Sequence, residues 1–554
     1  VALPLSMALA IASGVPPQHG LYTAIVAGVA IAALGGSRVQ VSGPTAAFVV
    51  VLAPIATQFG LGGLLLATLL AGVLLVGMGA ARLGRFIEFV PYPVTTGFTA
   101  GIAVVIGALQ LKDFLGLSVP RMPDHFLERL GAILAALPTT RGSDVMVGLS
   151  TLAVLMAWPR RWGRRLPAPL IALLAGAAVA AVMARAVPDF EVATIATRFS
   201  YEAGGELRAG IPRQPPLPVL PWNLPGPEGG RLALSFDLVR ALAPSAFAIA
   251  MLGAIESLLS AVVADGMTGR KHDADAELTA QGIGNIVGPF FGGIAATGAI
   301  ARTATAVRSG ARSPLAAALH ALVVLAAVLL AAPLLGHLPM ASLAALLMVV
   351  AWNMSESEHV LHLVRSAPRS DAAVLLICFG LTVLFDMVVS VTAGVVIAAL
   401  LFMRRMAEVS GVTLVGDRHP QLREPLPRGV VLYEVAGPLF FGAAQKALSV
   451  LSAVEGRPVR VVVLDVENVP AIDATGLVAL ESLVRRLNEA GVKVVLVGVE
   501  GQPLRALARA GWRNRKGRLR IFHSFERGIA VARSTVERNP PSRPPAAPEA
   551  PPAA

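Results

Sequence analysis

Several long tracts in this chain contain no charged side chain, and they limit the folds that it can adopt. Residues 60–81, GLGGLLLATLLAGVLLVGMGAA, and residues 313–335, SPLAAALHALVVLAAVLLAAPLL, are two of them. A helix needs about 20 apolar residues to cross the hydrocarbon core of a bilayer. Only 14% of the 554 residues are charged, whereas soluble domains carry roughly a quarter. The chain is therefore predicted to be a polytopic membrane protein.

These tracts predict fourteen transmembrane spans. Their ranges are 1–12 (interpreted as a truncated first span), 20–36, 43–57, 61–81, 93–111, 143–158, 167–184, 240–264, 278–291, 298–309, 314–332, 339–353, 371–387 and 389–403. Lys and Arg follow the even-numbered spans, as at Arg38, Arg308 and Arg404, and the short loops after spans 1, 3, 9, 11 and 13 contain neither. Loops on the cytoplasmic side are rich in Lys and Arg. The excess of 46 basic over 34 acidic residues is thus expected to reflect membrane topology rather than nucleic-acid binding.

A different pattern begins after residue 405. Short β-branched runs alternate there with helical stretches, for example VRVVVLDVE at 459–467 before a helical stretch at 475–490, which predicts a small α/β domain. No glycine-rich phosphate loop follows a strand, which argues against a nucleotide-binding enzyme. The expected organisation is a transmembrane domain at 1–405, a linker at 406–427, a cytoplasmic α/β domain at 428–535 and a disordered proline-rich tail at 536–554.

Two of the predicted spans are interrupted by small and hydroxyl residues. SGPT occupies residues 42–45, and GGIAATGAIARTATAVRSG occupies residues 292–310. Interrupted spans at matching positions of two halves point to the binding site of a transporter with an inverted repeat. A helix that begins near Pro44 with Ser42 as its cap, and another that begins near Thr297, would direct two positive helix ends at an anion. The alternative is that each break is a kink for helix packing.

Glu256 and Arg302 are charged residues that lie away from the ends of predicted spans. Glu256 has apolar neighbours in span 8, and because a charged acid is costly at that depth, we expect it to bind and release a proton. The alternatives for Glu256 are a static ion pair and a core acid that stays protonated. Arg302, in the second broken span, would either attract an anionic substrate or form a fixed pair with Glu256. No catalytic triad or zinc-ligand pattern occurs and Cys378 is the single cysteine, so we expect neither an enzyme nor a metal or other cofactor.

Several motifs resemble those of one family. PQHGLYTAIVAGVAIAALGGSR at 17–38 is similar to the Pro-x-x-Gly-Leu-Tyr-Thr … Gly-Ser-Arg pattern of the sulfate permease (SulP), or solute carrier 26, anion transporters, and SGPTAAF and GAIARTA fit too. The α/β domain looks like the cytoplasmic STAS domain of that family. More narrowly, AMLGAIESLLSAVVADG at 250–266 and LLMVVAWNMSE at 346–356 resemble the bacterial branch that takes up C4-dicarboxylic acids.

The resemblance implies a fold and a site. The fold would be an all-α membrane domain of fourteen spans with a seven-plus-seven inverted repeat, followed by the α/β STAS domain. A core (spans 1–4 and 8–11) would move against a gate (spans 5–7 and 12–14), usually in a homodimer. The site would comprise Ser42, Gly43, Thr45, Glu256, Ala301 and Arg302. In this family glutamate at position 256 is associated with proton coupling, and members that use sodium have an acidic residue with hydroxyl partners in spans 8 and 10.

Two positions differ from related patterns. Several relatives have serine where this chain has Ala301, so anion contacts there are expected to come from the backbone. Thr475 stands where stand-alone anti-sigma antagonists carry a phosphorylatable serine, which makes it a candidate regulatory residue. The alternative for Thr475 is a loop hydroxyl near a helix start.

These patterns predict a secondary active transporter of small dianions in the bacterial inner membrane. Proton-coupled uptake of C4-dicarboxylates (succinate, fumarate, aspartate) is the first interpretation. The alternatives are a sulfate or bicarbonate transporter coupled to protons or sodium, an uncoupled anion exchanger or channel, and a membrane scaffold that works through its STAS domain. The expected partners are the small anion, protons, the lipid bilayer, a second copy of the chain and a cytoplasmic protein at the STAS domain, but no nucleic acid.

Overall fold

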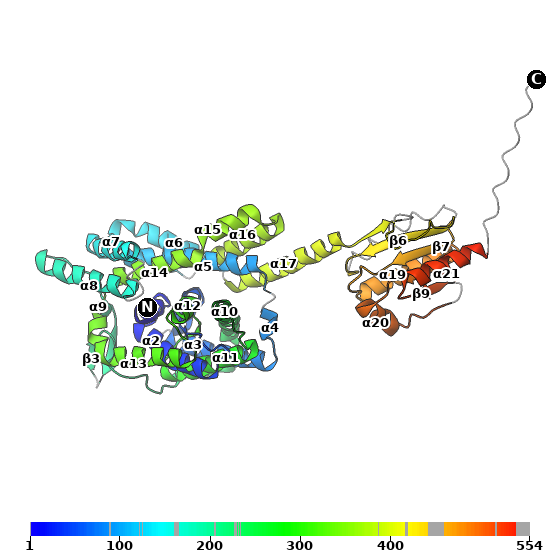
Figure 1. Ribbon diagram of the computed structural model, residues 1–554. Coiled ribbons are helices and arrows are strands. Elements are labelled where there is room, and N and C mark those ends of the chain that lie inside the picture. The colour runs from blue at the N-terminus through cyan, green and yellow to red at the C-terminus, as the bar shows by residue number, and fades with distance from the viewer. Residues whose placement is uncertain are drawn as a thin grey trace, which may run out of the picture. The chain divides into compact units, whose positions relative to one another are not determined.

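The computed structural model describes residues 2–538 apart from 88–89, 121, 124–125, 160–165, 204–205, 227–229, 231, 233, 386, 416–418, 441–458 and 516–517. The chain divides into two compact units, Val1–Ala398 and Ala399–Ala554, and the boundary falls within helix α17 (Met387–Val409) (Figure 1). The first unit is helical and the second is an α/β domain, as the sequence predicts. The proline-rich tail from residue 539 onward lies outside the described residues.

Helices account for most of the first unit. They are α1 (Ala2–Ala12), α2 (Pro17–Leu34), α3 (Ala46–Ala80), α4 (Gly84–Ile87), α5 (Tyr92–Phe114), α6 (Phe126–Ala135), α7 (Gly142–Ala157), α8 (Ala168–Ala186), α9 (Ile195–Arg198), α10 (Phe236–Thr268), α11 (Ala274–Val287), α12 (Ile300–Arg308), α13 (Leu315–Gly336), α14 (Met340–Ser355), α15 (Ser357–Ser366), α16 (Arg369–Leu384) and the first part of α17. Short 3-10 helices span Leu137–Thr139, Pro221–Asn223 and Gly288–Phe291, and a hairpin joins β2 (Ser200–Ala203) to β3 (Glu206–Ala209).

Every predicted span overlaps a helix, although residues 43 and 298, where spans 3 and 10 are predicted to begin, lie in short strands. Within the described residues, eight helical segments are long and apolar enough to cross a membrane, so the count of fourteen spans remains a prediction. Spans 3 and 4 both lie in α3, which bends at Gly60 (φ 68°, ψ −175°). A Cβ at Gly60 would lie 2.6 Å from the carbonyl carbon of Gly226. The left-handed backbone and the close neighbour both require glycine at this bend.

The helices of the first unit pack in two groups (Figure 1). In one group, α3 packs against α10 and α11, α2 packs against α11 and α13, and α12 packs against α10. In the other group, α5 packs against α14 and α16, and α7 packs against α8 and α14. Helix α1 contacts both α2 and α14. This grouping agrees with the core and the gate that the family resemblance implies.

The second unit is built on a five-stranded sheet in the order β5-β6-β7-β8-β9. The strands are β5 (Gly411–Leu414), β6 (Val430–Ala436), β7 (Val461–Asp465), β8 (Lys493–Val497) and β9 (Leu519–Ile521). Strand β5 is antiparallel to β6, and the other neighbours are parallel. Because β5 lies inside 406–427, the sheet begins within the segment that the sequence assigned to a linker. Four residues directly after a helix carry too little alternation to reveal an edge strand.

Both faces of the sheet are covered. Val461 and Val463 of β7 belong to an apolar core shared with α21 (Phe525–Glu537). Val462 and Leu464 belong to the opposite core, which contains residues of α19 (Ala474–Glu489) and α20 (Gly501–Arg509). Burial on both faces explains why β7 is a continuous apolar run rather than an alternating one.

Candidate functional site

The two interrupted segments meet in the interior of the first unit. Ser42–Gly43 (β1) pairs antiparallel with Thr297–Gly298 (β4), and all four residues are buried. The amide of Ala299 also donates to the carbonyl oxygen of Val41 at 2.9 Å. An unsatisfied backbone group inside a bilayer costs several kcal/mol. Each break therefore satisfies backbone groups of the other, which explains why neither span needs to run through as a continuous helix.

Two helices begin directly after the paired strands. Thr45 is the N-cap of α3 and Ala299 is the N-cap of α12, and no side chain in the described part of the chain caps either helix. The prediction that Ser42 caps a helix starting near Pro44 is wrong. Ser42 lies in β1, and its hydroxyl accepts a hydrogen bond from Gln281 Nε2 at 3.1 Å. The free N–H groups of both first turns carry positive partial charge, and together they favour an anion.

Arg302, in the first turn of α12, reaches across to the start of α3. Its Nη2 donates to the carbonyl oxygen of Pro44 at 2.9 Å and to Ser6 Oγ at 3.3 Å. Its side chain is buried, and Nε and Nη1 have no hydrogen-bond partner among the described residues. The fixed ion pair with Glu256 that the sequence left open is not formed between these two described side chains. Because a buried cation with unpaired donors is costly, the arrangement favours a negatively charged ligand.

Gly43 leaves the space that this guanidinium occupies. A Cβ at Gly43 would lie 2.5 Å from Nη1 of Arg302 and 3.6 Å from Cα of Ala24. A Cβ that close would force the Arg302 side chain to move. Glycine at position 43 therefore leaves room for the guanidinium, which lies beside the backbone of the strand pair.

Glu256 of α10 contacts the start of α3 directly. Thr45 Oγ1 donates a hydrogen bond to Glu256 Oε2 at 2.7 Å. Both side chains are partly exposed, and Ala301 in the first turn of α12 is exposed. Ala301 offers no polar side-chain group, so its backbone N–H is the donor that it can present. The structure thus brings all six predicted membrane site residues together around the two helix starts.

Sequence reasoning missed a buried polar network that supports the strand pair. Its centre is Glu277 of α11, which is fully buried. Glu277 Oε1 accepts from Gln40 Nε2 at 2.9 Å, Ser257 Oγ at 3.1 Å and Gln281 Nε2 at 3.2 Å, and Oε2 accepts from the Ser37 amide at 3.1 Å. Since Gln281 also binds Ser42, the network connects α10, α11 and β1.

The sequence does hold a signal for this network. Glu277, Gln281 and Asn285 are four residues apart and form a polar stripe along one face of α11. Asn285 continues the stripe toward the second broken segment. Its Nδ2 donates to the Ala296 carbonyl oxygen at 2.9 Å, and its Oδ1 accepts from the Ala296 amide at 2.8 Å. The segment that precedes β4 is therefore fixed by a side chain.

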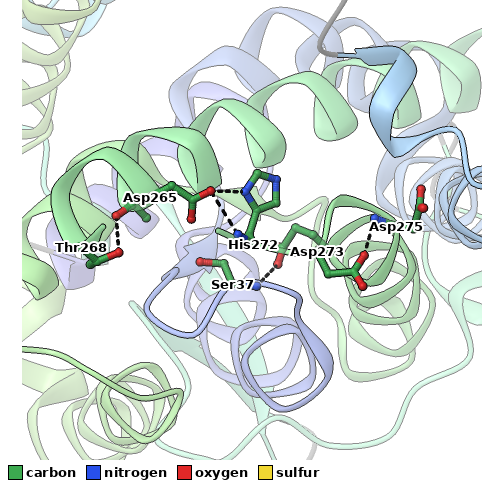
Figure 2. Close-up of polar contacts among 8 residues, drawn as sticks. Ser37, Asp265, Thr268, His272, Asp273 and Asp275 are labelled. Atoms are coloured by element: carbon green, nitrogen blue, oxygen red, sulfur yellow. Dashed lines mark hydrogen bonds and ion pairs between the residues drawn. The ribbon is translucent and has the colours of Figure 1, made fainter. Parts of the chain in front are cut away.

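The turn between α10 and α11 holds the start of α11 beside that network (Figure 2). Asp265 Oδ2 lies 2.7 Å from His272 Nδ1 and accepts from the His272 amide at 3.1 Å. Asp273 caps α11 by accepting from two amides of its first turn, each at 3.1 Å. The Asp273 amide in turn donates to the carbonyl oxygen of Gly36 at 3.4 Å. The loop after α2 is thus tied to α11 next to the bond between Ser37 and Glu277.

Thr475 belongs to the second unit and does not take part in this site. It is exposed in the first turn of α19. Asp473 caps that helix by accepting from the Gly476 amide at 2.7 Å. The role of Thr475 in regulation stays a prediction.

Two family models match the chain. Residues 1–378 match the sulfate permease family, and residues 423–525 match the STAS domain. This chain belongs to the sulfate permease family. YvdB of Bacillus subtilis, provisionally named a sulfate transporter, is 40% identical over 523 residues, which cover 94% of this chain and 93% of YvdB. The bicarbonate transporter BicA of Picosynechococcus is 30% identical over 536 residues, which cover 92% of this chain and 88% of BicA.

Solved structures agree with this assignment. The transmembrane domain of a cyanobacterial bicarbonate transporter BicA superposes with a TM-score of 0.61 at 28% identity, over 70% of this chain and 94% of that domain. Murine solute carrier 26 family member A9 in its inward-facing state gives a TM-score of 0.81 at 19% identity, over 96% of this chain and 89% of that chain, and shows the fold alone. The protein is therefore a multi-pass membrane anion transporter with a C-terminal STAS domain, and not an enzyme.

Proposed function

We propose that this transporter moves a small oxyanion, sulfate or bicarbonate, across the membrane together with protons. The choice of cargo rests on the names of the relatives, which state sulfate for YvdB and bicarbonate for BicA. The names of these relatives give no support to the C4-dicarboxylates that the sequence motifs suggested. Succinate and fumarate therefore enter the test below as competitors rather than as the expected cargo.

The proposed anion site lies where α3 and α12 begin, and one observation carries it. Arg302 is buried beside two uncapped helix starts with Nε and Nη1 unpaired in the described part of the chain. An oxyanion there would accept hydrogen bonds from the guanidinium and from first-turn amides, including that of Ala301. Charge-assisted bonds of this kind are stronger than neutral ones. Ser42 and Gly43 would serve the site through their backbone, since they hold the two helix starts together.

The proposed proton carrier is Glu256. Its carboxyl group is bonded to Thr45, the N-cap of one of the two helices that would hold the anion. A carboxylate this close to the anion would repel it. Protonation removes the negative charge of Glu256 and with it the repulsion. Binding of a proton and binding of an anion would therefore favour one another, as symport requires.

Transport by the full chain in proteoliposomes tests the proposal. Labelled sulfate and bicarbonate are offered with an imposed proton gradient, with a sodium gradient and with neither, while a pH indicator reports proton movement. We expect accumulation driven by the proton gradient, with proton uptake on addition of substrate. Accumulation with sodium alone would assign the coupling to sodium, and purely downhill movement without proton flux would indicate a channel or exchanger. Stronger competition by succinate or fumarate than by sulfate would restore the C4-dicarboxylate interpretation.

The arrangement of the chain in the cell is also a proposal. The placement of Lys and Arg after alternate spans supports a STAS domain on the cytoplasmic side of a bacterial plasma membrane. A reporter enzyme that works only in the cytoplasm, fused after residue 538, should be active if the STAS domain is cytoplasmic.

We also propose that the chain forms a homodimer, because the family resemblance implies one. We further propose that the STAS domain binds a cytoplasmic protein, because the exposed start of α19 offers a surface for it. Cross-linking of membranes should then trap a species of twice the chain mass.

A further inference from the structure

Thr45 stands where two hydrogen-bonding roles compete. An N-cap threonine ordinarily accepts a hydrogen bond from an amide in the first turn of its helix. The hydroxyl of Thr45 caps no amide of α3, and instead donates to Glu256 Oε2 at 2.7 Å. A hydroxyl has a single proton to donate. While Glu256 is charged, that proton is committed to the carboxylate and is withheld from any anion at the start of α3.

We infer that Thr45 is a hydrogen-bond relay between proton binding at Glu256 and anion binding at the start of α3. When a proton from water binds the carboxylate, Glu256 acquires an O–H group that donates to Thr45 Oγ1. The hydrogen bond then runs in the opposite direction, and the hydroxyl proton of Thr45 becomes free to donate to the anion. One proton moves from water to the carboxylate, and no other covalent bond forms or breaks. This inference rests on the proposed function.

The surroundings of Glu256 leave Thr45 as the group placed for this role. Within the described part of the chain, Thr45 is the hydrogen-bond partner that Glu256 has. Helix α3 contains no titratable residue. On α12, Arg302 directs Nη2 to Pro44 rather than to the carboxyl group. On α11, Glu277 is held by its own donors, including the hydroxyl of Ser257.

A charged pair at the C-terminal end of α10 is more distant. Asp265 and His272 bind one another there. Asp265 lies nine positions along the chain from Glu256. The other helix start has no equivalent relay, because Ala299 and Ala301 carry no hydroxyl. The inference therefore assigns the linkage between proton and anion to one side chain on one of the two helices.

The test measures anion affinity across a range of pH for the purified full chain and three variants. Thr45→Val keeps the side-chain shape without the hydroxyl, and Thr45→Ser keeps the hydroxyl. Thr57→Val is the matched control, because Thr57 lies on the same helix and its hydroxyl donates to the Ala53 carbonyl oxygen of that helix, at 2.9 Å. Substrate-induced proton uptake is recorded in parallel, and gel filtration checks that each variant is folded.

The unaltered chain should bind the anion more tightly as pH falls. In Thr45→Val this gain should shrink by about tenfold, the size expected for one hydrogen bond to a charged group. Thr45→Ser should restore the pH dependence, and Thr57→Val should behave as the unaltered chain does. If Thr45→Val binds at no pH, Thr45→Ser decides, since a serine variant without pH dependence would overturn the relay.

Two outcomes separate the relay from the proposed function. A Thr45→Val chain with unchanged pH dependence and proton uptake would overturn the relay and leave proton coupling in place. An unaltered chain whose affinity does not vary with pH, and which takes up no protons with its substrate, would overturn the coupling itself.

Discussion

The starts of α3 and α12 have the same backbone arrangement and different side chains. Each follows a two-residue strand, and neither is capped by a described side chain. At α3, the N-cap Thr45 binds an acid, Glu256. At α12, the N-cap is Ala299, and Arg302 sends its guanidinium to the other helix. The difference teaches that the two helix starts offer similar backbone donors, while a titratable group from α10 lies at the start of α3 and a permanent charge lies in the first turn of α12.

The largest effect is expected for Glu256→Gln, which removes the titratable group from the α3 side. Glutamine is close in shape to the protonated acid, so substrate should still bind and exchange should persist. Accumulation against a gradient and the pH dependence of uptake should both be lost. The measurement is uptake driven by a proton gradient beside substrate exchange, with folding checked by gel filtration.

The same variant also tests the division of roles between the two helix starts. The structure shows no ion pair between the described side chains of Glu256 and Arg302, so glutamine breaks no buried pair and the variant should fold as the unaltered chain does. A well-folded Glu256→Gln chain that still accumulates substrate in a pH-dependent way would remove Glu256 from coupling.

The next largest effect is expected for Gly43→Leu, which disturbs the permanent charge instead. A side chain at Gly43 displaces Nη1 of Arg302, which lies 2.5 Å from the position of the added Cβ. Anion affinity should fall by roughly tenfold or more, about 1.4 kcal/mol, while the pH dependence that Glu256 provides should remain. Gly298→Ala is the counterpart on the other strand, where the new Cβ would collide with the Gln40 amide and should reduce folding instead. Unchanged binding in a folded Gly43→Leu chain would contradict the proposed site.

A smaller effect is expected when the chain is truncated after about residue 425. The two helix starts lie wholly within the first unit, so rate or assembly should decline without a change in the ranking of competing anions. The truncation also removes Asp465, a titratable group of the second unit. Burial raises the pKa of Asp465, and its Oδ2 lies 3.0 Å from His419 Nε2. Retained pH dependence would place its origin in the first unit. A changed anion ranking would show that the STAS domain contributes to the site.

The smallest effect is expected for Ala301→Ser, which makes the α12 side more like the α3 side. The added hydroxyl offers the anion one more donor at an exposed position, and because water competes there, such a bond should contribute about 1 kcal/mol net. Affinity should rise by a few fold, and its pH dependence should not change, because no titratable group is added. A new pH dependence in this variant would show that the two helix starts are not specialised as described.

The fold could be predicted from the sequence wherever the signal is local. Apolar tracts such as 60–81 indicated the helices, and alternating β-branched runs indicated the α/β domain. The paired breaks at 42–45 and 292–310 located the candidate site, because small residues and proline are conspicuous within apolar spans. The family model and the relatives then confirmed the sulfate permease assignment, but the motifs at 250–266 and 346–356 did not establish the cargo.

The remaining details depend on contacts between distant residues. Ser42 and Thr45 are both residue types that favour the N-cap position of a helix. Ser42 pairs with Gly298 in the second half of the membrane unit, and this contact leaves Thr45 as the N-cap of α3. The bond from Thr45 to Glu256 joins residues on separate helices, so no local pattern encodes it. The network around Glu277 could have been predicted locally. Glu277, Gln281 and Asn285 recur every four residues, which places them on one face of a helix.

The pairing of β1 with β4 has a consequence for synthesis of the protein. Ser42 leaves the ribosome 256 positions before Gly298, the residue that it faces. At about 5–20 residues per second, the first strand waits roughly 10–50 s for its partner. Throughout that interval the backbone groups of Ser42 and Gly43 lack their partners in the second half. The lipid of the membrane offers them no hydrogen bonds. The nascent first half must therefore be sheltered by water or by the insertion machinery, and slower translation would prolong the period in which it is open to degradation.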